Sequence, residues 1–170
     1  DFLLATGSRL KPADVDLTPR YLRLTRKGLL AGASAELLQE GLRSSARADA
    51  IAERTVLPDF VKVCPGDTPI SMTSFHRAGL ATGLDLASGV AVRALLVDSL
   101  ASTAEPRQVN VLDLCCAPGG KALYLAELLP AGSVTGIDLC QKRLAQCAGA
   151  VRRHNLTNVR LLCMDATGPT

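Results

Sequence analysis

The residues best placed for chemistry lie in a short apolar run that turns through Pro-Gly-Gly into a helical pattern, from Val109 to Lys121. A strand that ends at a glycine-rich turn lets a small molecule approach the backbone closely. The helix that follows directs unpaired N–H groups and the positive end of its dipole toward that molecule. This junction predicts a binding site for a small molecule that carries a carboxylate or a phosphate.

Acidic residues stand at or near the ends of three apolar runs: Asp113 before the turn, Asp138 after the second run and Asp165 after the third. In a nucleoside-binding sheet, an acid roughly 20 residues beyond the glycine-rich turn accepts hydrogen bonds from the ribose hydroxyls. Asp138 fits that role, and Asp165 would then lie near the base, where a carboxylate can accept from an exocyclic amine. Each of these two acids could instead cap the helix that follows it.

The spacing within the turn separates the candidate ligands. The chain has neither the Gly-x-Gly-x-x-Gly spacing of dinucleotide sites nor the Gly-x-x-x-x-Gly-Lys-Ser/Thr spacing of phosphate loops. Both absences disfavour NAD and nucleoside triphosphates. A nucleoside joined to an amino acid has a carboxylate for the helix start and a ribose for Asp138, so the predicted cofactor is S-adenosylmethionine.

The elements that must position these residues alternate between strand and helix. Such alternation predicts an α/β fold with a parallel sheet, in which ligands bind at the carboxyl ends of the strands. Three parallel strands would leave a face and an edge uncovered, so we expect residues 109–170 to be the first half of a larger domain. The predicted strands are Val109 to Leu114, Ser133 to Ile137 and Asn158 to Met164, and the predicted helices are Gly119 to Leu129 and Gln141 to Asn155.

The chain before this region is less regular. Residues 1–74 are predicted to form a small α+β module, and residues 75–108 a linking segment. The linking segment contains a predicted helix from Leu86 to Leu100, with Asp85 or Ser88 available to cap its start. In the module we predict a strand at Tyr21 to Thr25, a helix at Ser34 to Leu42 and a short apolar segment at Phe60 to Cys64.

The composition is that of a globular protein. The 170 residues are 48% hydrophobic and 21% charged, with a formal net charge of +3, and no apolar run is long enough to cross a bilayer. Because no pair of Cys-x-x-Cys motifs occurs, neither a zinc site nor a disulfide framework is favoured. We expect reduced thiols in an intracellular protein, with no metal and no membrane partner. The cysteines are Cys64, Cys115, Cys116, Cys140, Cys147 and Cys163.

Three stretches carry a resemblance to a known family. Asp113-Leu-Cys-Cys-Ala-Pro-Gly-Gly-Lys121 closely resembles the Asp-x-Cys-Ala-Ala-Pro-Gly-Gly-Lys-Thr signature of the Sun/Fmu family of RNA 5-methylcytosine methyltransferases, which use S-adenosylmethionine. The segment from Phe75 to Ser88 resembles the family's Tyr/Phe-x-x-Gly-x-(x)₃-Gln-Asp-x-Ala-Ser segment, and Pro19 to Thr25 is similar to its Pro-x-x-x-Arg-x-Asn strand. The resemblance implies a Rossmann-like class I methyltransferase core, of which this chain holds the β-α-β-α-β first half.

The resemblance also implies roles for particular residues. Asp138 would hold the ribose, Asp165 would approach the adenine, and Arg143 would lie close to the cofactor. Three positions depart from the family: Thr25 replaces Asn, Leu84 replaces Gln and Ala122 replaces Thr. The residues that would wrap the methionine end of the cofactor are Cys115, Cys116, Ala117, Pro118, Gly119, Gly120 and Lys121.

The implied reaction is methyl transfer to carbon 5 of a cytosine in rRNA or tRNA. In the family, a cysteine thiolate adds to carbon 6 of the base and a second cysteine helps to release the product. Both cysteines belong to later motifs, so we expect no catalytic residue before Thr170. Cys115 and Cys116 would face the cofactor rather than a base, and are not expected to act as nucleophiles.

Two other functions stay open from the sequence. The chain could belong to a catalytically silent relative that acts as an assembly factor in a ribosomal or other RNA–protein complex. It could also belong to a methyltransferase that acts on a small molecule or a protein, although the family-like segments Pro19 to Thr25 and Phe75 to Ser88 would then be unexplained. The predicted partners are RNA and, beyond it, ribosomal or assembly proteins.

A basic cluster is the candidate for RNA contact. Arg20, Arg23, Arg26 and Lys27 lie close together in the sequence, and the alternative is a solvated run of charge. The isolated histidines His76 and His154 are expected to be structural or exposed.

Overall fold

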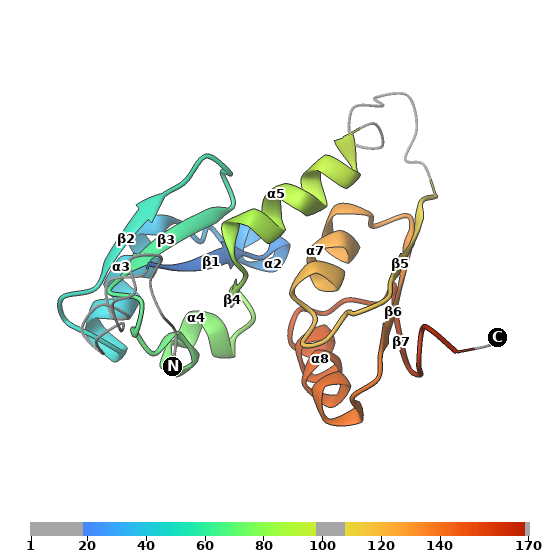
Figure 1. Ribbon diagram of the computed structural model, residues 1–170. Helices are drawn as coiled ribbons and strands as arrows, with labels where there is room; N and C mark the ends of the chain where they lie inside the picture. Colours follow the sequence, from blue (N-terminus) through green and yellow to red (C-terminus); the bar gives the residue numbers. More distant parts are fainter. Residues whose placement is uncertain (1–18, 98–107, 169–170) are drawn as a thin grey trace, which may run out of the picture.

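A computed structural model describes residues 19–97 and 108–168 and shows two sheets, each with its own helices (Figure 1). The last residues of the helix predicted to end at Leu100 lie outside the described residues. Each sheet has its own group of buried apolar residues. We call the parts around the two sheets the N-terminal module (described residues 19–83) and the C-terminal unit (described residues 108–168).

The N-terminal module has a four-stranded antiparallel sheet in the order β2-β3-β1-β4. The strand β4 falls within the predicted linking segment and pairs with β1, so the sheet extends past the predicted boundary at residue 74. The strands are β1 (Arg20–Leu24), β2 (Ile51–Arg54), β3 (Phe60–Cys64) and β4 (Ala81–Gly83), and the helices are α2 (Arg26–Leu30), α3 (Ala35–Ser45), a 3₁₀ turn η1 (Ile70–Met72) and α4 (Ser74–Arg77).

The helix α3 shows how the sequence builds this module. Ser34 precedes it, and the Ser34 side chain accepts a hydrogen bond from the Leu37 N–H, which satisfies one of the free donors at the helix start. Ala35, Leu38 and Leu42 are buried because their spacing places them on one face of the helix. That face packs on the buried residues of β1 and β3, which are Leu22, Leu24, Val61 and Val63.

The C-terminal unit confirms the predicted β-α-β-α-β order. Its three strands are parallel in the order β5-β6-β7, and Figure 1 shows α7 and α8 on the same face of the sheet, toward the N-terminal module. Val111 packs toward the core, whereas its neighbour Leu112 is 56% exposed, because successive strand residues point to opposite faces. The elements are β5 (Asn110–Asp113), α7 (Gly120–Leu128), β6 (Ser133–Asp138), α8 (Gln141–Arg153) and β7 (Val159–Cys163).

The helix α5 (Leu86–Leu95) leads from the N-terminal module to the C-terminal unit. Asp85 caps its start by accepting a hydrogen bond from the Ser88 N–H at 2.8 Å, as predicted. Arg93 on α5 donates to the Tyr124 hydroxyl at 2.6 Å and to Asp59 at 2.9 Å. Arg93 therefore connects α5 to α7 and to the turn that precedes β3.

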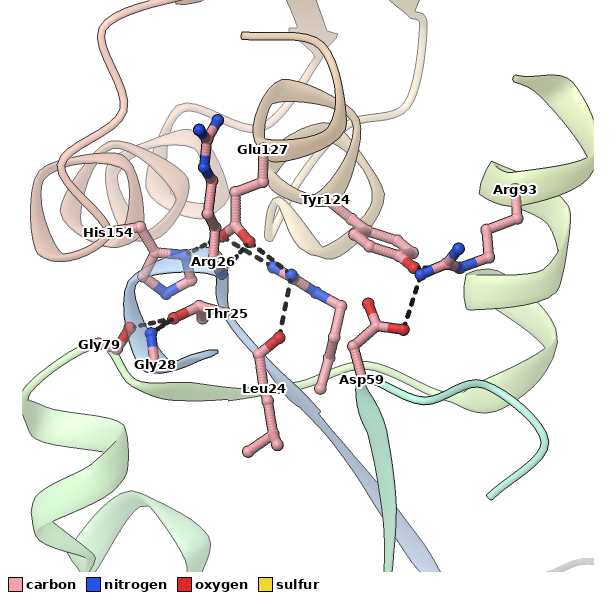
Figure 2. A network of polar contacts seen from close by, with 11 residues as sticks. Leu24, Thr25, Arg26, Gly28, Asp59, Gly79, Arg93, Tyr124, Glu127 and His154 are labelled. Carbon is pink, nitrogen blue, oxygen red and sulfur yellow. Dashed lines mark hydrogen bonds and ion pairs between the residues drawn. The ribbon is translucent and has the colours of Figure 1, made fainter. Parts of the chain in front are cut away.

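A buried ion pair joins the N-terminal module to the C-terminal unit (Figure 2). Arg23 on β1 donates from Nη1 to Glu127 Oε2 at 2.6 Å and from Nη2 to Oε1 at 3.0 Å. The Arg26 backbone N–H donates to Oε2 at 2.7 Å, and His154 Nδ1 lies 3.3 Å from Oε1. The Arg23 guanidinium also lies 4.5 Å from the ring centroid of Tyr124. Both carboxylate oxygens of Glu127 thus have partners.

Thr25 keeps a structural role although the family has Asn at this position. Its Oγ1 accepts from the Gly28 N–H at 3.0 Å, which caps α2, and donates to the Gly79 carbonyl at 2.7 Å. A threonine hydroxyl can do both at once, because it is a donor and an acceptor. The substitution therefore leaves no buried polar group without a partner at this point.

We predict that acid destabilises the protein partly through Glu127. Burial opposes ionisation, but the hydrogen bonds from His154 and Arg23 outweigh it and lower the pKa of Glu127 from 4.5 to about 2. A lowered pKa stabilises the folded state above the unfolded-state pKa, and this contribution of roughly 3 kcal/mol is lost as the pH falls from about 5 to about 2. Urea unfolding of wild type and Glu127→Gln across this range should show the variant less stable at neutral pH, with a shallower acid dependence.

The matched control is Glu36→Gln, which removes an exposed glutamate that also pairs with an arginine. Glu36 is exposed and its ion pair with Arg54 is screened by water, so the variant should unfold like wild type. Equal acid dependence in wild type and Glu127→Gln would contradict this account of the pair.

Two glycines with left-handed backbone give a second prediction. Gly32 (φ 78°) and Gly79 (φ 72°) both need this conformation, but a Cβ at Gly32 would meet open space whereas one at Gly79 would overlap the carbonyl oxygen of Arg153. Gly32→Ala should cost about 1 kcal/mol for the backbone alone, and Gly79→Ala about 3 kcal/mol or more. Thermal unfolding measures both, and equal losses would show that Gly79 is not a close contact between the two parts.

Candidate cofactor site

The predicted cofactor turn, residues 115–121, has the backbone that a close approach requires. Gly119 adopts a left-handed conformation (φ 113°) directly before α7, and a Cβ there would lie 2.6 Å from Cys147 Sγ. A Cβ at Gly120 would lie 2.9 Å from Leu84 Cδ1. A Cβ at either glycine would require the neighbouring side chain to shift, and Gly119 is needed for its backbone angle as well.

Asp138 fastens the turn to the end of β6. Its Oδ2 accepts from the Ala117 N–H at 3.1 Å, and its Oδ1 accepts from the Cys140 N–H at 2.9 Å. The Cys140 N–H is the largest cause of a lowered Asp138 pKa; burial opposes it, and the Ala117 N–H and Arg143 assist it. The carboxylate is ionised at neutral pH, and each oxygen keeps acceptor capacity beyond the one bond it makes.

Arg143 holds the same turn from α8. Its Nη2 donates to the Ala117 carbonyl and lies 3.7 Å from Asp138 Oδ2. The side chain is half exposed, so it closes the turn from the solvent side. The structure thus brings Arg143 and Asp138 to the turn, and their contact with a cofactor stays a prediction.

One carboxylate oxygen of Asp113 has no hydrogen-bond partner among the described residues. Its Oδ1 accepts from the Cys115 N–H at 3.2 Å, but its Oδ2 is buried and has no hydrogen-bond partner among the described residues. A buried carboxylate oxygen of this kind calls for a donor. Sequence reasoning noted Asp113 but did not include it among the site residues, although its position directly before the turn was the available signal.

Asp165 lies apart from the turn. It is exposed, and its Oδ1 accepts from the Thr167 N–H at 2.8 Å and the Thr167 hydroxyl at 2.7 Å. It still stands at the same edge of the sheet as Asp138, because Cys163 at the end of β7 pairs with Asp138. A role near the adenine stays a prediction.

The two cysteines of the turn differ in environment. Cys115 is exposed, whereas Cys116 is buried, and burial followed by the nearby Cys147 raises the pKa of Cys116 to about 12. A thiol with this pKa is protonated at neutral pH and is a poor nucleophile. This agrees with the expectation that Cys116 packs rather than reacts.

A cavity of about 660 Å³ opens beside the turn, between the N-terminal module and the C-terminal unit. We call it the inter-module cavity. Asp138, Arg143 and Gly119 do not line it, so the turn has one side held by these residues and another side that faces the cavity. Residues 115–118, 120 and 121 of the turn line the cavity, together with Arg20, Tyr21, His76, Leu84, Asp85, Gln146 and Arg153, among others.

The four basic residues predicted to form one RNA-contacting cluster do not form a single exposed group in the structure. Arg23 is 1% exposed because Glu127 binds it, and Lys27 donates to the carbonyls of Ala78 at 2.8 Å and Arg153 at 3.4 Å. Arg20 lines the inter-module cavity, whereas Arg26 lines other surface pockets. His154 is buried against Glu127, in line with its expected structural role.

Two classes of site are not found in the described parts of the chain. Residues 19–97 and 108–168 contain no group of three or more His, Cys, Asp or Glu side chains that could hold a metal ion. Within the same ranges, no helix combines the length and the apolar character needed to span a membrane.

Comparison with known proteins shows a family similarity in the C-terminal part of the chain. Residues 100–170 match the family model described as 16S rRNA methyltransferase RsmB/F. This part of the chain is therefore similar to that methyltransferase family. The similarity supports the predicted cofactor class, S-adenosylmethionine.

Curated methyltransferases match over part of the chain. A probable ribosomal RNA small subunit methyltransferase B from Bacillus subtilis is 36% identical over 110 residues, which cover 64% of this chain and 22% of the relative. A tRNA (cytosine(72)-C(5))-methyltransferase from Pyrococcus horikoshii is 38% identical over 64 residues, which cover 36% of this chain and 16% of the relative. The chain therefore spans about a fifth or less of the length of these two curated relatives.

Solved structures agree with the fold. A methyltransferase homologue from Pyrococcus horikoshii superposes with a TM-score of 0.63 at 23% identity, over 87% of this chain and 44% of that chain. NSun6 from the same organism superposes with a TM-score of 0.53 at 16% identity, over 89% of this chain and 60% of that chain. Both likenesses cover the N-terminal module as well as the C-terminal unit, and they support the Rossmann-like fold.

The thiol environments predict a labelling pattern. Burial raises the pKa of both Cys116 and Cys147, whereas Cys115 and Cys163 are exposed. Iodoacetamide at about pH 8 should modify Cys115 and Cys163 in the folded protein, and Cys116 and Cys147 only after unfolding, because the thiolate is the reactive form. Peptide mass spectrometry gives the sites. Rapid modification of Cys116 in the folded protein would contradict its assignment as a packed thiol.

Proposed function

We propose that this chain binds S-adenosylmethionine at the turn of residues 115–121 for methyl transfer to carbon 5 of a cytosine in RNA. The observation that carries the proposal is the arrangement around this turn, in which a helix start and two carboxylates converge. The names of the relatives, which act on ribosomal RNA or on a tRNA cytosine, support the substrate.

The residues present fit the amino-acid end of the cofactor. The free N–H groups at the start of α7 suit its carboxylate. The buried Asp113 Oδ2, which has no partner among the described residues, suits its ammonium group. One turn can thus satisfy both charges of a methionine end.

Asp138 is the proposed ribose acceptor. Its carboxylate is fixed by the Ala117 and Cys140 N–H groups and keeps free acceptor capacity. Because the same carboxylate holds the turn, Asp138 fixes the part of the site for the methionine end relative to the part for the ribose. Arg143 supports this arrangement through the Ala117 carbonyl.

The bound cofactor supplies the methyl group, and this chain binds and orients it. The buried Cys116 thiol is protonated and does not provide the nucleophile for the base. The resemblance to the family instead implies cysteines in motifs that follow Thr170. An intracellular location stays a prediction.

Calorimetric titration of the full-length protein with S-adenosylmethionine tests the proposal. Wild type should bind, and Asp138→Ala should weaken binding at least tenfold, since it removes a charged hydrogen-bond acceptor of roughly 1.5–3 kcal/mol. The control is Asp49→Ala, which removes an exposed carboxylate of the N-terminal module and should leave binding unchanged. Absence of binding by wild type, or equal binding by Asp138→Ala, would refute the site.

Transfer of a labelled methyl group to RNA tests the reaction itself. A methyltransferase should place the label on carbon 5 of cytosine, which nucleoside mass spectrometry identifies. Binding of the cofactor without transfer to any RNA would instead favour the catalytically silent assembly factor.

A further inference from the structure

We infer that the inter-module cavity binds the sugar-phosphate backbone of a single RNA strand, with Arg20 and Arg153 as phosphate contacts. The inference rests on the proposed function, because it requires that RNA is the substrate. It assigns to Arg153, at the end of α8, a role that no sequence motif indicated.

The charge of the cavity favours a polyanion. Arg20, Lys121 and Arg153 line it, and none of the three makes an ion pair with a carboxylate of the described residues. Asp85 is the acidic residue in the lining, and its two oxygens are already bound by the Ser88 N–H at 2.8 Å and the Ser88 hydroxyl at 2.6 Å. Phosphate groups would pair these cations.

The position of Arg153 is fixed by the contact between the two parts of the protein. Its carbonyl oxygen packs against Gly79 and accepts from Lys27 at 3.4 Å. Its Nε is buried and has no hydrogen-bond partner within the described residues. The backbone of Arg153 is therefore held by the N-terminal module, while its guanidinium retains donors for a ligand.

The lining also suits nucleotides beyond their charge. Tyr21 is half buried in the cavity wall and offers a ring on which a base can stack. Burial, followed by the charges of Arg153 and His154, lowers the pKa of His76, so this imidazole is neutral and the positive charge comes from Arg20, Arg153 and Lys121. A volume of about 660 Å³ is in the range of sites for molecules of nucleotide size.

The cavity is suited to the RNA rather than to the cofactor. Asp138, the proposed ribose acceptor, does not line it, and the one carboxylate that does, Asp85, is used as a helix cap. The cavity nevertheless includes residues 115–118, 120 and 121 of the cofactor turn. A strand bound by Arg20 and Arg153 would therefore pass directly beside the turn that holds the methyl donor.

The test compares two neighbouring arginines on α8. Arg153 lines the cavity, whereas Arg152 is exposed and does not, so Arg153→Glu and Arg152→Glu change the net charge equally. Fluorescence anisotropy of a labelled single-stranded RNA with the full-length protein should show an affinity at least tenfold lower for Arg153→Glu and for Arg20→Glu, and near wild type for Arg152→Glu. The salt dependence of log Kd should also become shallower by about 0.7 for each lost phosphate contact.

Two further measurements keep the outcomes distinct. Calorimetry should show unchanged S-adenosylmethionine binding in all three variants. If Arg153→Glu fails to fold, Arg153→Gln takes its place; this variant removes the charge without reversing it and should also weaken RNA binding. Equal RNA affinities for the Arg152 and Arg153 variants, with cofactor binding intact, would overturn the inference alone. Loss of cofactor binding by wild type would instead refute the proposed function.

Discussion

The structure depends on one buried ion pair, between Arg23 of β1 and Glu127 of α7. Moving either charge out of water alone costs several kcal/mol, so each part of the protein carries a group that is satisfied only when the other is present. The Arg26 N–H also donates to Glu127, and His154 packs beside the same carboxylate. The N-terminal module is thereby held in one register against α7, the helix whose first residues form the cofactor turn. Both walls of the inter-module cavity follow from this register.

The cofactor turn makes contacts on two sides. On one side, Asp138 and Arg143 bind the backbone of Ala117 and so define the shape of the proposed cofactor site. On the other side, residues of the same turn face the cavity that we assign to RNA. A methyl donor and its acceptor must approach each other closely, and a shared turn between two binding surfaces meets that requirement. Gly119 makes the arrangement possible, since its left-handed backbone favours glycine and a Cβ there would displace the Cys147 side chain.

The sequence was sufficient for features that local chemistry determines. Alternating apolar runs predicted the β-α-β-α-β order, and the spacing of acids after each run predicted that Asp113, Asp138 and Asp165 would share one edge of the sheet. Contacts between distant residues could not be predicted in this way. Arg23 lies 104 residues from Glu127, so nothing near it in the sequence indicates that it is buried while Arg20 is exposed. The cavity and the place of Arg153 in it depend on the same long-range contact, and the free oxygen of Asp113 appears only once the turn is folded.

A double-mutant cycle on Arg23 and Glu127 tests the central claim most directly. The free energies of unfolding of wild type, Arg23→Met, Glu127→Gln and the double variant give the coupling between the two side chains without the separate effects of each substitution. The account predicts a coupling of about 2 kcal/mol or more, because each single variant leaves a buried charge without its partner. A coupling near zero, with the two single losses simply adding in the double variant, would show that the pair does not hold the two parts of the protein together.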